Sequence, residues 1–99
     1  MTERYEVEMT VPLGVRRGVM VFKEQDGIVK GTFEILGHET AFEGRMNGKY
    51  LTISGKLETS IREICYTGRG MLENDCIQMQ LQSEKGIYEI TGVRSPSDR

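Results

Sequence analysis

The stretch that decides the fold runs from Phe42 to Gly55 and reads FEGRMNGKYLTISG. On either side of Asn47-Gly48, apolar residues or glycines alternate with polar residues, which is the period of a strand with one buried face. Asn and Gly tolerate the positive φ that both central positions of a type I′ turn require. The stretch therefore predicts an antiparallel hairpin, with Phe42, Leu51 and Ile53 facing inward.

The same alternation recurs on both sides of this hairpin, in short segments between turn residues such as Pro12-Leu13-Gly14 and Gln25-Asp26-Gly27. We interpret the chain as eight strands. Seven have a clear inner face, made by Tyr5, Val7, Met9 and Val11; Gly18, Met20 and Phe22; Val29, Gly31, Phe33 and Ile35; Thr40, Phe42, Gly44 and Met46; Leu51, Ile53, Gly55 and Leu57; Ile77, Met79 and Leu81; and Tyr88, Ile90 and Gly92.

The segment from Thr59 to Tyr66 fits two structures. Ser60 and Glu63 have the spacing of a helical capping box, and the apolar residues after Leu57 recur at helical intervals, so a short helix is possible. We favour a strand, because the segment is rich in strand-forming residues and its inner-face parity continues into Gly68 and Gly70.

Regular strands with short connections predict an antiparallel up-and-down meander of about eight strands. We expect it to close into a small all-β barrel, because no residues remain to cover the apolar face of an open sheet. Six glycines share the inward face of the strands, and we interpret them as bends and points of tight closure rather than as space for a ligand. These are Gly18, Gly31, Gly44, Gly55, Gly68 and Gly92.

Length and charge set the broad class. The 99 residues predict one barrel domain over 1–94 and a frayed tail over 95–99. The formal net charge of −2 gives no excess of basic residues for nucleic-acid binding. No apolar run is long enough to span a membrane, and the first residues lack the pattern of a signal peptide, so we expect a cytoplasmic protein.

A compact meander with glycine-rich strands and hairpin turns resembles the calycin group, which comprises the lipocalin, fatty-acid-binding and avidin barrels. The resemblance covers nearly the whole chain, and Arg94 stands where such barrels often place a closing arginine. The Gly-x-Trp signature of lipocalins is absent, because the chain has no Trp. The resemblance implies a small barrel that binds an apolar or carboxylate-bearing molecule.

Inward parity singles out candidate ligand-binding residues near the strand ends. A barrel could bring an arginine and one or two tyrosines together at one mouth, where the planar guanidinium would bind a carboxylate. The alternative is that the tyrosines fill the core with their hydroxyls at the rim and that the arginines end in water. The candidates are Tyr5, Arg62, Tyr66, Tyr88 and Arg94.

Catalytic and cofactor signals are weak. His38 stands at a turn, where a lone histidine is usually only solvated, and no nucleophile can be paired with it from spacing. Cys65 and Cys76 match neither a disulfide framework nor a zinc site. Gly68-Arg69-Gly70 lacks the context of a nucleotide-binding loop. We therefore expect no metal, no cofactor and no catalytic residue.

Apolar residues at outward positions indicate a partner. Val15, Val19, Val21 and Ile28 lie on the outer face of strands two and three, and the last strand adds Ile87 and Val93. Self-association is the simplest use of such a patch, so we expect a homodimer. Two functions remain open: a small-molecule-binding barrel, and an interaction module or accessory subunit whose solid barrel carries its working surface outside.

Overall fold

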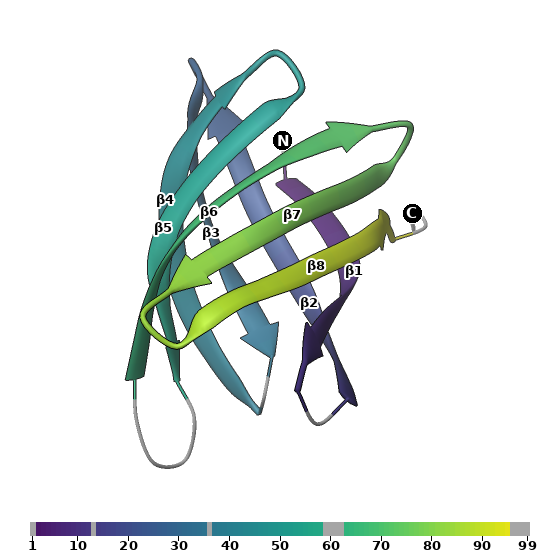
Figure 1. Ribbon diagram of the computed structural model, residues 1–99. Helices are drawn as coiled ribbons and strands as arrows, with labels where there is room; N and C mark the ends of the chain where they lie inside the picture. Colours follow the sequence, from purple (N-terminus) through teal and green to yellow (C-terminus); the bar gives the residue numbers. More distant parts are fainter. Residues whose placement is uncertain (1, 13, 36, 59–62, 96–99) are drawn as a thin grey trace.

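A computed structural model describes residues 2–12, 14–35, 37–58 and 63–95. They form eight antiparallel strands in up-and-down order that close into a barrel (Figure 1). The expected fold class is therefore confirmed. The strands are β1 (Thr2–Val11), β2 (Gly14–Gln25), β3 (Ile28–Ile35), β4 (His38–Asn47), β5 (Tyr50–Glu58), β6 (Glu63–Glu73), β7 (Cys76–Ser83) and β8 (Gly86–Arg94).

The strands are staggered around the barrel. Directly paired residues can be followed from Val15 on β2 through β1, β8, β7, β6, β5, β4 and β3, and the path returns to β2 at Gln25. Such a stagger requires the strands to tilt against the barrel axis, as the ribbon shows (Figure 1). Each cross-strand row of side chains therefore climbs as it passes around the molecule.

Inward side chains fill the barrel. The alternation seen in the sequence is the alternation of burial along the strands, so the inner faces predicted for the seven clear strands are confirmed. Eighteen hydrophobic residues are at most 8% exposed, and the described residues include no buried charged side chain. Phe22 and Phe33 are the largest of the fully buried side chains.

The inward glycines mark places where neighbouring strands approach each other very closely. A Cβ at Gly31 would overlap the backbone oxygen of Val21, and a Cβ at Gly44 would overlap that of Thr52. A side chain at either glycine would therefore meet backbone of the neighbouring strand rather than open space. Their role is tight packing and bending of the barrel wall, as expected from the sequence.

Two-residue turns join several hairpins, and one differs from the prediction. Asn47 is the last residue of β4 and pairs with Tyr50, so the turn is Gly48-Lys49 rather than Asn47-Gly48. Only Gly48 has a positive φ, 64°, which is the pattern of a type II′ turn instead of type I′. Type II′ suits a hairpin equally well because glycine occupies its first central position. The shift of the turn by one residue moves the hairpin register by two, so Phe42 pairs with Gly55, whereas an Asn47-Gly48 turn would pair it with Ile53.

The structure describes part of the segment for which the sequence allowed either a strand or a helix. Residues from Glu63 onward are strand, which favours the strand interpretation for that portion, whereas 59–62 lie outside the described residues. Of the expected tail, Ser95 donates a backbone hydrogen bond to the Arg4 carbonyl at 2.9 Å, and 96–99 lie outside the described residues.

Candidate functional site

The predicted ligand-binding residues do not meet at one mouth. Tyr5 and Arg94 are directly paired at the end that carries the β6–β7 turn. Tyr66 pairs with Ser83 at the opposite end, beside the β7–β8 turn, and Tyr88 lies on β8 close to the same turn. Arg62 lies outside the described residues. The barrel thus separates the candidates into two pairs.

Arg94 closes one end of the barrel. Its Nε lies 2.9 Å from the Asp75 carboxylate, its Nη1 contacts the Glu3 carboxylate, and its guanidinium lies 5.4 Å from the centre of the Tyr5 ring. Burial raises the pKa of Tyr5, with a further contribution from the negative charge of Asp75. The arginine is therefore engaged by groups of its own chain.

Tyr66 lies deep in the other half of the core. Its residue is 3% exposed, and its hydroxyl has no hydrogen-bond partner among the described residues. Burial raises the pKa of Tyr66 well above its ordinary value, because the phenolate would lose its hydration there. The ring packs edge-on against Phe33, at 6.3 Å between centroids. The Tyr66 ring fills the core, and its hydroxyl is buried there rather than placed at the rim of the barrel.

Depressions of the molecule lie on the outside of the barrel. Four of them are lined mainly by outward side chains, and each follows a cross-strand row that contains one or two of the strand glycines. Two rows of outward side chains form the walls of such a groove, and the backbone between them forms its floor. The two grooves of greatest chemical interest pass over β1 and over β5 respectively. These two strands lie on opposite sides of the barrel (Figure 1).

The acidic groove is the depression over β3, β2, β1, β8 and β7, with a volume of about 930 Å³. Its floor includes Gly18 and Gly92. One wall is the paired row Glu34, Val19, Glu6, Val93 and Cys76, and the other is Arg17, Glu8, Thr91 and Gln78.

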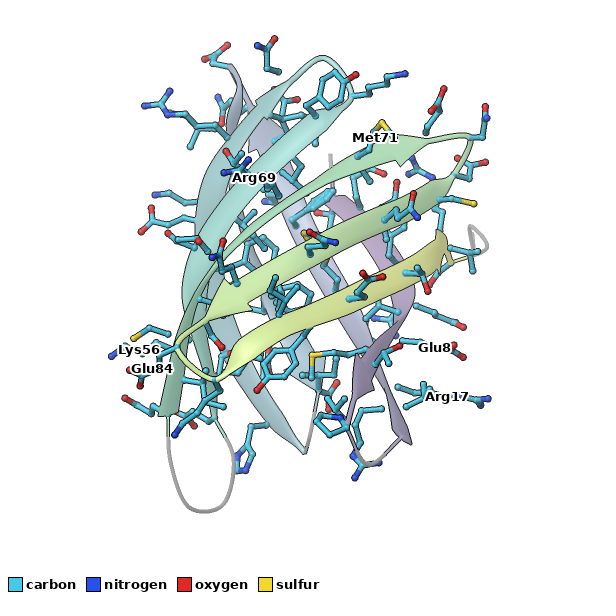
Figure 2. The ribbon with its side chains drawn as sticks, viewed as in Figure 1. Glu8, Arg17, Lys56, Arg69, Met71 and Glu84 are labelled. Carbon is cyan, nitrogen blue, oxygen red and sulfur yellow. The ribbon has the colours of Figure 1, made fainter. Side chains whose placement is uncertain are left out.

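Charge and apolar surface alternate in the first of these walls. Arg17 and Glu8 form an ion pair at 3.5 Å in the second wall, and Figure 2 shows both side chains extending away from the barrel. Glu6 and Glu34, which flank Val19, form no ion pair with any described residue. The groove thus presents two uncompensated carboxylates beside exposed apolar surface.

The basic groove is the depression over β4, β5, β6 and β7 that also reaches Ile87 on β8, with a volume of about 630 Å³. One wall is the paired row Arg45, Thr52, Arg69 and Gln80, and the other is Glu43, Ser54, Thr67 and Gln82; Gly44 and Gly68 contribute to the floor.

Two uncompensated cations flank the centre of the basic groove. Arg45 and Arg69 lie on either side of Thr52 in one row, and neither forms an ion pair with a described residue. Figure 2 shows Arg69 on the side of the barrel away from Glu8 and Arg17. Glu43 is the one carboxylate among the residues that line this groove.

The predicted interface residues all lie outside the barrel, but they do not form one compact patch. Val19 and Val21 lie two residues apart on β2 and are half-buried, and Val19 lines the acidic groove together with Val93. Val15 and Ile28, which are 52% and 45% exposed, lie toward opposite ends of the β2–β3 hairpin. The outward apolar residues of β2 and β8 are therefore separated by the polar outer face of β1, where Glu6 stands between Val19 and Val93.

Sequence reasoning missed both grooves. The patterns that build them were visible, because every second residue of a strand lies outside. What could not be read was which outward residues stand side by side, since Glu6, Val19 and Glu34 come from three different strands. A complete strand register would have revealed these rows.

Within 2–12, 14–35, 37–58 and 63–95, no group of three or more His, Cys, Asp or Glu side chains is placed to hold a metal ion. Those residues include no helix long and apolar enough to cross a membrane. Comparisons with protein-family models, with curated proteins and with solved structures found no match to this chain.

Proposed function

We propose that the protein is an interaction module, a solid barrel whose working surface is the acidic groove on its outer face. The observation that carries this proposal is the contrast between inside and outside. The described core is packed with side chains, and its glycines face neighbouring backbone rather than open space. A binding surface on the outside requires no rearrangement of that core, which favours an interaction module over a ligand held within the barrel.

The chemistry of the groove favours a partner that is both basic and apolar. Glu6 and Glu34 form no ion pair with a described residue, and Val19 stands between them. Removing Val19 and Val93 from water would supply part of the binding energy, because apolar burial contributes about 25 cal/mol per Å². Cationic groups on the partner would add charge complementarity, which governs specificity and association rate.

A designed peptide tests this proposal. A capped peptide of alternating Lys and Val, five residues long, is titrated into ¹⁵N-labelled protein while backbone amide shifts are followed by NMR. We expect saturable shifts concentrated on β1, β2 and β8 around Glu6, Val19 and Val93. The Glu6→Gln/Glu34→Gln variant should weaken binding at least several-fold, because it removes both uncompensated charges.

Two control peptides define the chemistry. A peptide with Glu in place of Lys should not bind, because it would place like charges together, and one with Ser in place of Val should bind more weakly. Equal binding of the Lys and Glu peptides would overturn the proposal. Shifts confined to inward residues such as Tyr66 or Tyr88 would instead support a ligand site within the barrel.

A further inference from the structure

We infer that the partner of the acidic groove is a second copy of this chain, which binds through its basic groove, so that copies associate head to tail. The inference rests on the proposed function of the acidic groove and names its occupant. Its basis is the opposite charge and the matched spacing of two rows on opposite sides of one molecule.

The two rows have the same spacing. Glu34, Val19 and Glu6 are directly paired across β3, β2 and β1, so the two carboxylates stand two strand spacings apart with Val19 between them. Neighbouring strands lie about 4.8 Å apart, so the Cα atoms of the two glutamates are separated by about 10 Å.

Arg45, Thr52 and Arg69 repeat that geometry on β4, β5 and β6, with opposite charge. When the two rows face each other, each glutamate meets an arginine, and Val19 meets the Thr52 side chain with its methyl group. The pairing would give all four uncompensated groups a counter-charge. Arg can form two parallel hydrogen bonds to a carboxylate, which adds geometric specificity to the attraction.

A symmetric dimer through either groove lacks this complementarity. A two-fold contact between acidic grooves would bring Glu6 and Glu34 of both copies to one interface, and like charges destabilise such a contact. A contact between basic grooves would do the same with Arg45 and Arg69. The head-to-tail arrangement avoids both, and it leaves one free groove of each kind at the ends of an assembly.

Two neutralised variants test the arrangement. Glu6→Gln/Glu34→Gln disables the acidic groove and Arg45→Gln/Arg69→Gln disables the basic one. Each is studied alone and mixed with the other by sedimentation velocity and native mass spectrometry. The variant Glu63→Gln/Glu84→Gln is the control, because it removes two exposed carboxylates outside both grooves.

We expect the wild type to form dimers and larger species as its concentration rises, and to return to monomer at about 1 M salt, where the Debye length is about 3 Å. Each groove variant alone should remain monomeric, whereas an equimolar mixture should form a one-to-one complex and nothing larger, because only one complementary pair of grooves remains. The control should assemble like the wild type.

Three outcomes would overturn the inference. These are a wild type that stays monomeric at millimolar concentration, a groove variant that self-associates as well as the wild type, and a mixture that gives no complex. If the Lys-Val peptide still binds the acidic groove in any of these cases, the interaction module stands and only its occupant is wrong. If the peptide also fails to bind, both proposals fail.

Discussion

The acidic and basic grooves lie on opposite sides of one barrel and are built on similar backbone. In each, glycines contribute to the floor, and two rows of outward side chains form the walls. They differ in the wall chemistry: the residues lining the acidic groove carry three carboxylates and one guanidinium, whereas those lining the basic groove carry two guanidiniums and one carboxylate. A closed barrel can therefore vary its outer surface without altering its core, because inward and outward residues alternate on every strand.

Both grooves have glycines in their floors, and substitution of these glycines should have the largest effect on folding stability. We expect Gly44→Val beneath the basic groove and Gly18→Val beneath the acidic groove each to destabilise the protein by about 3 kcal/mol, or to prevent folding. At both positions a Cβ would overlap a backbone oxygen of the neighbouring strand, Thr52 and Glu34 respectively. Urea denaturation followed by circular dichroism measures the change.

The matched control for the glycine variants is Ser54→Val, which adds bulk at an exposed outward position beside the same floor. It should change stability by less than about 0.5 kcal/mol, as expected for a surface substitution. If either glycine variant has the same urea midpoint as the wild type, that side of the barrel has room for a side chain. The two groove floors would then not be equally tightly packed.

The buried tyrosines of the two sides also differ in their surroundings, and the variant Tyr66→Phe tests this difference. Tyr5 on β1 lies against Arg94, whereas the Tyr66 hydroxyl on β6 has no hydrogen-bond partner among the described residues. Removing an unsatisfied buried hydroxyl should be neutral or stabilise the fold by up to about 1 kcal/mol. A loss greater than about 1 kcal/mol would show that the hydroxyl has a partner. Tyr50→Phe, at an exposed ring, is the control.

The stability of the protein at alkaline pH should also depend on the buried Tyr66 hydroxyl. The ordinary tyrosine pKa is 10.0, and burial raises the pKa of Tyr66 in the folded state. Above about pH 10 the unfolded chain therefore loses a proton that the folded protein keeps, so stability falls as pH rises. Tyr66→Phe should remove that part of the alkaline loss, as measured by urea midpoints between neutral and alkaline pH. An unchanged pH profile would count against the buried, solvent-excluded hydroxyl.

The smallest expected change in folding stability comes from the repulsion between two carboxylates on the acidic side. Glu34 and Glu39 are both exposed and stand directly opposite each other on β3 and β4, where like charges are unfavourable. Glu39→Lys should therefore stabilise the protein by about 0.5 kcal/mol in urea denaturation at low salt. Arg69→Gln should change stability less, because Thr52 separates Arg69 from Arg45. Equal effects on both sides would contradict the assignment of like-charge repulsion to the acidic side alone.

Most of the fold could be predicted from local pattern. The alternation around Phe33 or Leu51 assigns each residue to the inside or outside, because a strand places successive side chains on opposite faces. The turn was predicted less exactly, because Asn47-Gly48 indicated the hairpin correctly and its turn type wrongly. Glycine suits the second central position of a type I′ turn and the first central position of a type II′ turn, so its presence does not distinguish the two types. The segment 59–62 remains a prediction, because it lies outside the described residues.

The sequence by itself determined the all-β class, the meander, and the side of the wall on which each strand residue lies, because these depend on spacing along one strand and on short turns. Only the tertiary structure decided which strands' residues stand in one row, because register and stagger are properties of the whole closed barrel. The register of the closed barrel separates Tyr5 and Arg94 from Tyr66 and Tyr88, and it places Glu6 and Glu34 on either side of Val19.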